Sequence, residues 1–139
     1  MRNTVPWVRT VGVTFKEITA TRVVTQLPDD PALHNHVGGP HAAMTFGIGE
    51  TASGAVLLAA FADQLGRATP LVARTEIAYK KIGKGDLTAE AVLGRPAQEI
   101  VAELDAGTRP EFPVHITISN SEGETTAEMT VVWTLRPNR

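Results

Sequence analysis

The sequence predicts one α+β domain, residues 1–139, in which an antiparallel sheet packs against a single long helix. Apolar and polar residues alternate in segments on both sides of the chain's middle, which is typical of strands that bury one face. Between these segments lies one that is too apolar to form an exposed helix. A chain of 139 residues can bury one core but is short for two.

Two strands are expected before the helix, because two short segments alternate with a period of two. The alternating positions are Val11, Val13 and Phe15 in the first segment and Val23, Thr25 and Leu27 in the second. The run Pro28-Asp29-Asp30-Pro31 then predicts a turn.

A long helix is predicted over residues 41–66, with Pro40 in its first turn, where a missing N–H costs no helical hydrogen bond. Gly47, Gly49 and Gly54 lie inside this segment. Each glycine costs about 1 kcal/mol relative to alanine in a helix interior. We therefore expect the sheet to approach the bare helix backbone closely and to offset that cost.

Period-two alternation returns after the helix. Segments 73–79 and 87–93, separated by Gly83-Lys84-Gly85-Asp86, predict a hairpin. A short helix over residues 97–106 should end at Gly107. Segments 114–118 and 127–135 predict a second hairpin with its turn at Glu122-Gly123. Its polar positions, expected on the solvated face, are Thr126, Glu128, Thr130 and Thr134.

Composition narrows the partners and the compartment. A net charge of -2 gives no general attraction for nucleic acid, so no nucleic-acid partner is expected. The chain has no cysteine, which excludes disulfides and thiolate nucleophiles and fits a reducing compartment. The first twelve residues lack the apolar core of a signal peptide, and the longest apolar stretch, residues 52–62, is too short to span a bilayer. We expect a cytoplasmic protein without a membrane partner.

One segment carries a pattern that points to chemistry. It reads His34-Asn35-His36-Val37-Gly38-Gly39-Pro40-His41-Ala42-Ala43 and is followed by Glu50-Thr51-Ala52-Ser53. An Asn six residues before a His, small residues after that His and a carboxylate nine residues after it resemble the hot-dog-fold thioesterases. The pattern is similar to the phenylacetate-pathway and 4-hydroxybenzoyl-CoA group, and nearer still to an uncharacterised thioesterase-like branch.

The resemblance implies a hot-dog fold and an acyl-CoA thioesterase that requires no cofactor. It implies that Glu50 is the general base or nucleophile, that the N–H of Ala42 polarises the thioester carbonyl and that Asn35 positions water or substrate. His41 belongs to the same catalytic group, although a hydrogen bond that fixes the loop is its simpler role. The residues expected to bind substrate are His36, Gly39, Ser53, Arg74, Lys80 and Lys81. The last three, with Lys84, could meet the phosphates of coenzyme A, although a lysine next to a turn is usually just solvated.

Elementary physics supports these roles. A helix amino terminus offers unpaired N–H donors where thioester hydrolysis develops negative charge. A carboxylate in an apolar helix should have a raised pKa, which suits a base working near neutrality. If His41 and Glu50 share one regular helix, they lie about 13.5 Å apart along its axis and roughly 180° around it. A site that needs both must use two copies of the chain, so we expect a homodimer, possibly assembled into a tetramer.

Other interpretations of the same residues remain open. His34, His36 and His41 could bind a metal, but their spacing matches no known signature, so we expect no metal site. Gly38-Gly39 could cradle phosphate, although a plain turn is simpler. Some relatives place a hydroxyl at the positions of Gly54 or Val72, and its absence favours a module that binds acyl-CoA without hydrolysis. An acyl-CoA hydratase would need an Asp and His pair that the helix lacks.

Overall fold

The computed structural model describes residues 5–138. Its strands are β1 (Thr14–Ile18), β2 (Arg22–Leu27), β3 (Ala68–Tyr79), β4 (Leu87–Leu93), β5 (Glu111–Ser119) and β6 (Thr125–Pro137). Its helices are α1 (Pro6–Thr10), α2 (Ala42–Ala60) and α3 (Ala97–Asp105), with short 3-10 turns at Pro31–Leu33 and Ala62–Gln64. The six strands form one sheet in the order β1-β2-β4-β5-β6-β3, and every neighbouring pair is antiparallel.

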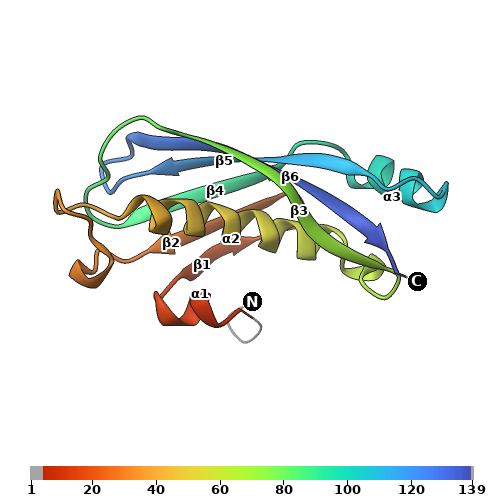
Figure 1. Ribbon diagram of the computed structural model, residues 1–139, viewed down its shortest axis with the longest axis horizontal. Helices are drawn as coiled ribbons and strands as arrows, with labels where there is room; N and C mark the ends of the chain where they lie inside the picture. The colour runs from red at the N-terminus through yellow and green to blue at the C-terminus, as the bar shows by residue number, and fades with distance from the viewer. Residues whose placement is uncertain (1–4, 139) are drawn as a thin grey trace.

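The long helix α2 lies against the inner face of the sheet, mainly over β2, β4 and β5 (Figure 1). Its fully buried residues Ile48, Ala52 and Val56 join the core that the strands complete. Alanines at the facing positions of β4, Ala89 and Ala91, are also fully buried, and their small side chains let the helix approach the sheet. The predicted α+β arrangement of an antiparallel sheet around one long helix is therefore confirmed.

The predicted hairpin between segments 73–79 and 87–93 is wrong. Strand β3 pairs with β6 at one edge of the sheet, whereas β4 lies between β2 and β5. Figure 1 shows the connection after β3 curving around one end of the sheet to reach β4. Alternation identifies a strand and its buried face but not its neighbour. The pairing partner is instead matched in length, because β3 has 12 residues and β6 has 13.

The first strand begins three residues later than predicted, because residues 6–10 form α1. Val11 and Val13 are buried as expected, but from the turn that joins α1 to β1. Gly12 in that turn has a φ of +79°, a conformation that favours glycine. The sequence expectation missed α1 because five residues are too few to show helical periodicity.

Helix α2 is shorter than predicted at both ends. It begins at Ala42, with His41 as its N-cap, so Pro40 precedes the helix and instead bridges to His34. It ends at Ala60, and the fully buried Phe61 leads into a 3-10 turn. By length and composition α2 could cross a membrane, but 56% of its apolar window is buried within the fold, as in a core helix.

The expectation that the sheet offsets the cost of the helix glycines holds for Gly49. A Cβ atom there would collide with the sulfur of Met129 on β6 and lie 3.2 Å from Ile118 on β5. At Gly47 the close neighbour is different, because a Cβ atom would meet the indole of Trp7 on α1. One of these two glycines is therefore required by the sheet and the other by the amino-terminal helix.

Two residues of β6 expected on the solvated face are buried. Thr126 is 3% exposed and Thr134 is 1% exposed. The hydroxyl of Thr126 donates to the carbonyl oxygen of Ile118, and that of Thr134 accepts from Nε of Arg109. A register shift between Ile118 and Ser119 interrupts simple alternation near Thr126. These buried positions tolerate threonine because its hydroxyl has a hydrogen-bond partner there.

Candidate functional site

The loop before α2 is folded around the side chain of Asn35. Its Oδ1 accepts hydrogen bonds from the backbone N–H groups of Val37 at 3.0 Å and Gly39 at 3.2 Å, and its Nδ2 donates to the carbonyl oxygen of Pro40 at 3.4 Å. Gly38 has a φ of +80°, as a tight turn requires. The Gly38-Gly39 pair therefore forms a turn, and Asn35 holds its shape.

The first turn of α2 presents one free backbone donor. His41 caps the helix, because its Nδ1 accepts from the N–H of Ala43 at 2.9 Å and its carbonyl oxygen accepts from the N–H of Met44 at 2.9 Å. Within residues 5–138, the N–H of Ala42 has no hydrogen-bond partner. Tyr79 donates its hydroxyl to the carbonyl oxygen of Ala42 at 3.2 Å and thereby ties β3 to this turn. The arrangement leaves the amide of Ala42 available to a ligand.

Ala42 is one of the residues that line a pocket of about 340 Å³. The pocket lies between the loop of Asn35, the first turn of α2 and the end of β3. Its lining residues are Asn35, Pro40, Ala42, Thr45, Tyr79, Lys80, Lys81, Ile82, Gly83 and Thr126. We call it the helix-start pocket. Gly39 supports its wall without lining it, because a Cβ atom there would lie 2.9 Å from the carbonyl oxygen of Gly83.

The expected phosphate-binding cations divide between two places. Lys80 and Lys81 line the helix-start pocket, whereas Arg74 lies elsewhere on β3 and pairs with Glu111 at 2.8 Å. Lys81 is 2.6 Å from Glu124, and its hydrogen bond, aided by one from Asn120, lowers the pKa of that carboxyl. Such exposed pairs contribute little net energy, so a lysine can exchange its carboxylate for a substrate anion.

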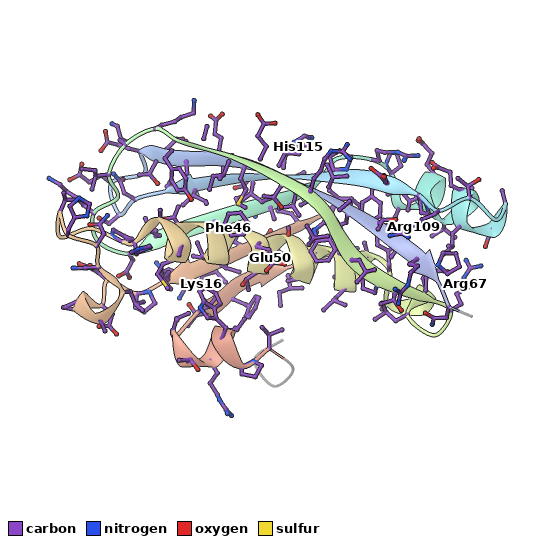
Figure 2. All side chains as sticks on the ribbon, in the orientation of Figure 1. Lys16, Phe46, Glu50, Arg67, Arg109 and His115 are labelled. Atoms are coloured by element: carbon purple, nitrogen blue, oxygen red, sulfur yellow. The ribbon has the colours of Figure 1, made fainter. Side chains whose placement is uncertain are left out.

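Glu50 lies in the middle of α2 (Figure 2) and is not among the residues that line the helix-start pocket. Its side chain is half-buried, and this burial raises the pKa of its carboxyl above the ordinary value of 4.5. Among the described residues, no side chain forms an ion pair or hydrogen bond with its carboxylate. The described residues therefore leave the charge of an ionised Glu50 uncompensated, and its raised pKa makes this carboxylate a stronger base than an exposed one.

Two other expected substrate-binding residues lie outside the pocket. Ser53 is fully buried; its hydroxyl donates to the carbonyl oxygen of Glu50 at 2.7 Å and accepts from the indole N–H of Trp133 at 3.1 Å. It links α2 to β6. His36 is exposed on the loop. Thr45 and Tyr79 line the pocket, yet sequence reasoning missed both; the only available signal was that Tyr79 is the single tyrosine, next to two lysines.

The expected angle between His41 and Glu50 needs correction. His41 is the N-cap and has an extended backbone, with φ -62° and ψ 143°, so the two residues do not share one regular helix. Helix geometry instead gives the separation between Glu50 and Ala42, the first helical residue. Eight residues place them about 12 Å apart along the axis and roughly 80° around it. The axial separation still keeps the free amide and the carboxylate of one chain from meeting at a single atom.

Two of the three histidines of the loop have structural partners. His34 is 2.7 Å from Asp29 through Nε2, and His41 caps α2. In the part of the chain that the structure describes, no group of three His, Asp or Glu side chains is arranged to hold a metal ion.

The family model for a domain of unknown function, DUF4442, matches residues 1–135. No curated protein matches the chain. Similar solved structures include a Pseudomonas aeruginosa protein of unknown function described as a probable thioesterase, with 20% identity, a TM-score of 0.85, and coverage of 99% of this chain and 91% of that one.

Two further solved structures have a similar backbone. A thioesterase family protein from Silicibacter pomeroyi is 18% identical with a TM-score of 0.79, over 98% of this chain and 93% of its own. A mutant of a thioesterase enzyme from Staphylococcus aureus is 17% identical with a TM-score of 0.76. The match covers 96% of this chain and 100% of that one. These similarities confirm the predicted hot-dog fold.

Proposed function

The chain belongs to the DUF4442 family, whose function is unknown. From the geometry of its site, we propose that the protein hydrolyses acyl-CoA thioesters. The observation that carries the proposal is the free N–H of Ala42, a residue that lines a pocket at the amino terminus of a 19-residue helix. Several proteins with this fold are described as thioesterases, which supports the same reaction class.

The chemistry follows from where charge develops. Attack on the thioester carbon moves an electron pair onto the carbonyl oxygen, and the Ala42 amide with the helix dipole stabilises that oxyanion. Glu50 accepts a proton from the attacking water, the carbon–sulfur bond breaks, and the proton passes to the departing thiolate. Alternatively the Glu50 carboxylate attacks first, and water then hydrolyses the resulting anhydride. Both routes give a free acid and the thiol of coenzyme A.

The proposed site combines two chains. The amide of Ala42 and the carboxylate of Glu50 lie about 12 Å apart along one helix, so Glu50 of the partner subunit would serve the helix-start pocket. Strand β3 offers the surface for this association, because it forms a free edge of the sheet and is 12 residues long. Its side chains Leu71 and Val72 are 36% and 42% exposed. A long apolar edge strand is suited to pairing with its own copy about a two-fold axis.

The direct test measures release of free thiol from a panel of acyl-CoA substrates by the wild-type protein and by Glu50→Gln. We expect the wild type to release thiol and the variant to lose about 10²-fold or more of the rate. Sedimentation of the same preparation at micromolar concentration should give a dimer or a tetramer. An active monomer would contradict the two-chain site.

A second candidate function is a module that binds acyl-CoA without hydrolysing it. It is favoured by Gly54 and Val72, which stand where some related enzymes carry a hydroxyl. This candidate predicts saturable binding of acyl-CoA by the wild type with no thiol released from any substrate in the panel. Thiol release that depends on Glu50 excludes it.

A further inference from the structure

A second pocket, distant in sequence from the helix-start pocket, lies where β6 ends. It has a volume of about 620 Å³ and is lined by Arg109, Arg136, Pro137 and Asn138. We call it the arginine pocket. Figure 2 shows Arg109 near the end of β6, and Figure 1 places the carboxyl terminus at the same end of the molecule. None of its lining residues is acidic, although the whole chain has a net charge of -2.

The hydrogen bonds around the arginine pocket occupy the side-chain acceptor of Asn138 but leave several side-chain N–H donors free. Arg109 uses Nε to donate to the hydroxyl of Thr134 at 3.0 Å, so its two terminal nitrogens stay available. Asn138 accepts through Oδ1 from Thr69 at 2.7 Å, which leaves its amide NH₂ as a donor. Within residues 5–138, neither Arg109 nor Arg136 forms an ion pair. Arg67, whose carbonyl oxygen accepts from the backbone N–H of Asn138, is already paired with Asp105 at 2.6 Å.

We propose that the arginine pocket binds a phosphate group. Two guanidinium groups and one amide offer hydrogen-bond donors from two segments of the chain, and a tetrahedral anion with several acceptor oxygens can accept from all of them. The buried Thr134 holds one guanidinium by its Nε atom, which reduces the conformational entropy lost on binding. A phosphate suits this set of donors better than a carboxylate does, because it presents three oxygens and a larger negative charge.

The position of the arginine pocket relative to β3 suggests the source of this phosphate, a step that rests on the proposed function. Thr69 at the amino end of β3 pairs with Arg136, whereas Tyr79 at its carboxyl end lines the helix-start pocket. If two β3 edges pair antiparallel about a two-fold axis, the amino end of one approaches the carboxyl end of the other. The arginine pocket of one subunit then binds a nucleotide phosphate of the coenzyme A whose thioester occupies the pocket of its partner.

Binding can be tested without turnover. Calorimetry with adenosine 3′,5′-bisphosphate and with inorganic phosphate should show binding to the wild type that Arg136→Gln and Arg109→Gln each weaken about tenfold. Arg9→Gln is the matched control, because Arg9 is an exposed arginine on α1 that lies outside this pocket. If neither ligand binds, or if Arg9→Gln loses as much affinity as the pocket variants, the proposal that the arginine pocket binds phosphate is wrong. Tighter binding of the bisphosphate supports the nucleotide as its source, whereas equal affinities overturn that assignment.

Kinetics then tests the link to the thioester site. With acyl-CoA, Arg136→Gln should raise KM about tenfold and leave kcat unchanged, while the same acyl group on pantetheine, which lacks phosphate, should show no change in KM. Equal changes with both substrates would overturn the link. If the bisphosphate binds but no thioester is cleaved, the proposed hydrolysis fails while the phosphate pocket stands.

Discussion

The imidazole Nδ1 of His41 accepts a hydrogen bond from the backbone N–H of Ala43 at 2.9 Å, so a histidine caps the helix whose first amide remains free. Because the cap satisfies Ala43 and the His41 carbonyl satisfies Met44, the unpaired donors of this helix start are reduced to Ala42. The cap thereby sets which amide can bind an oxyanion.

Replacing the cap should affect both folding and turnover. His41→Ala should lower the free energy of unfolding by about 1 kcal/mol, because the Ala43 amide loses its partner. Thiol release should also slow, since the first turn frays next to the pocket. His41→Asn keeps a capping acceptor and should restore most stability, while His36→Ala on the exposed loop is the control for stability. An unchanged melting temperature in His41→Ala would contradict the cap.

Asn35 can be separated into its acceptor and donor roles. Asn35→Asp keeps the two acceptor bonds to Val37 and Gly39 but removes the Nδ2 donor, whereas Asn35→Ala removes all three contacts. We expect both variants to lose activity, and Asn35→Asp to retain more of the wild-type melting temperature. Thermal unfolding and thiol release on one preparation measure the two effects. Wild-type activity in Asn35→Asp would restrict the residue to shaping the loop.

Glu50 should reveal its raised pKa in the stability of the fold. Desolvation raises the pKa in the folded state, so the protonated form stabilises the fold, and that contribution is lost as the pH rises through the folded pKa. Glu50→Gln does not lose stability in this way, because glutamine does not ionise. Compared with the wild type, it should be at least as stable at neutral pH, and its advantage should shrink in acid. A large loss of stability at neutral pH would instead indicate a counter-ion for Glu50.

The same pKa should appear in catalysis. If ionised Glu50 is the base or nucleophile, the wild-type rate should fall on the acid side, with a midpoint above the ordinary glutamate value of 4.5. The profile of kcat/KM against pH measures this limb directly. The residual rate of folded Glu50→Gln should lack it, whereas an identical acid limb in the variant would assign the titration to another group.

Gly49 tests the close approach of helix and sheet. Gly49→Ala should destabilise the fold by about 1–3 kcal/mol, because the added methyl group collides with Met129 and crowds Ile118. Gly66→Ala is the matched control, since a Cβ atom there meets nothing within 4 Å. Chemical unfolding of the two variants gives the comparison, and equal stabilities would show that the sheet moves aside at little cost.

Sequence reasoning found the strands that alternate and the helix that is apolar throughout, since both patterns are local. It did not find that β3 pairs with β6, because the pairing partner depends on the topology of the whole sheet. Within the site, the resemblance singled out Asn35, Ala42 and Glu50; Asn35 and Ala42 line the helix-start pocket, Glu50 does not, and the roles of all three stay predictions. The hydroxyl of Tyr79 at the first turn of α2 was missed, because that contact joins residues 37 positions apart. The burial of Ser53 against Trp133, 80 positions away, was missed for the same reason.

The pairing of β3 with β6 also has a consequence for how the chain is made. Strand β3 ends at Tyr79, but its neighbour begins only at Thr125, so a growing chain exposes an unpaired β3 until nearly all residues are synthesised. Closing so long a loop is entropically costly and slows folding. Newly made chains thus present a long apolar strand to one another before the sheet can form, and the order of synthesis makes β3 the segment most exposed to premature association.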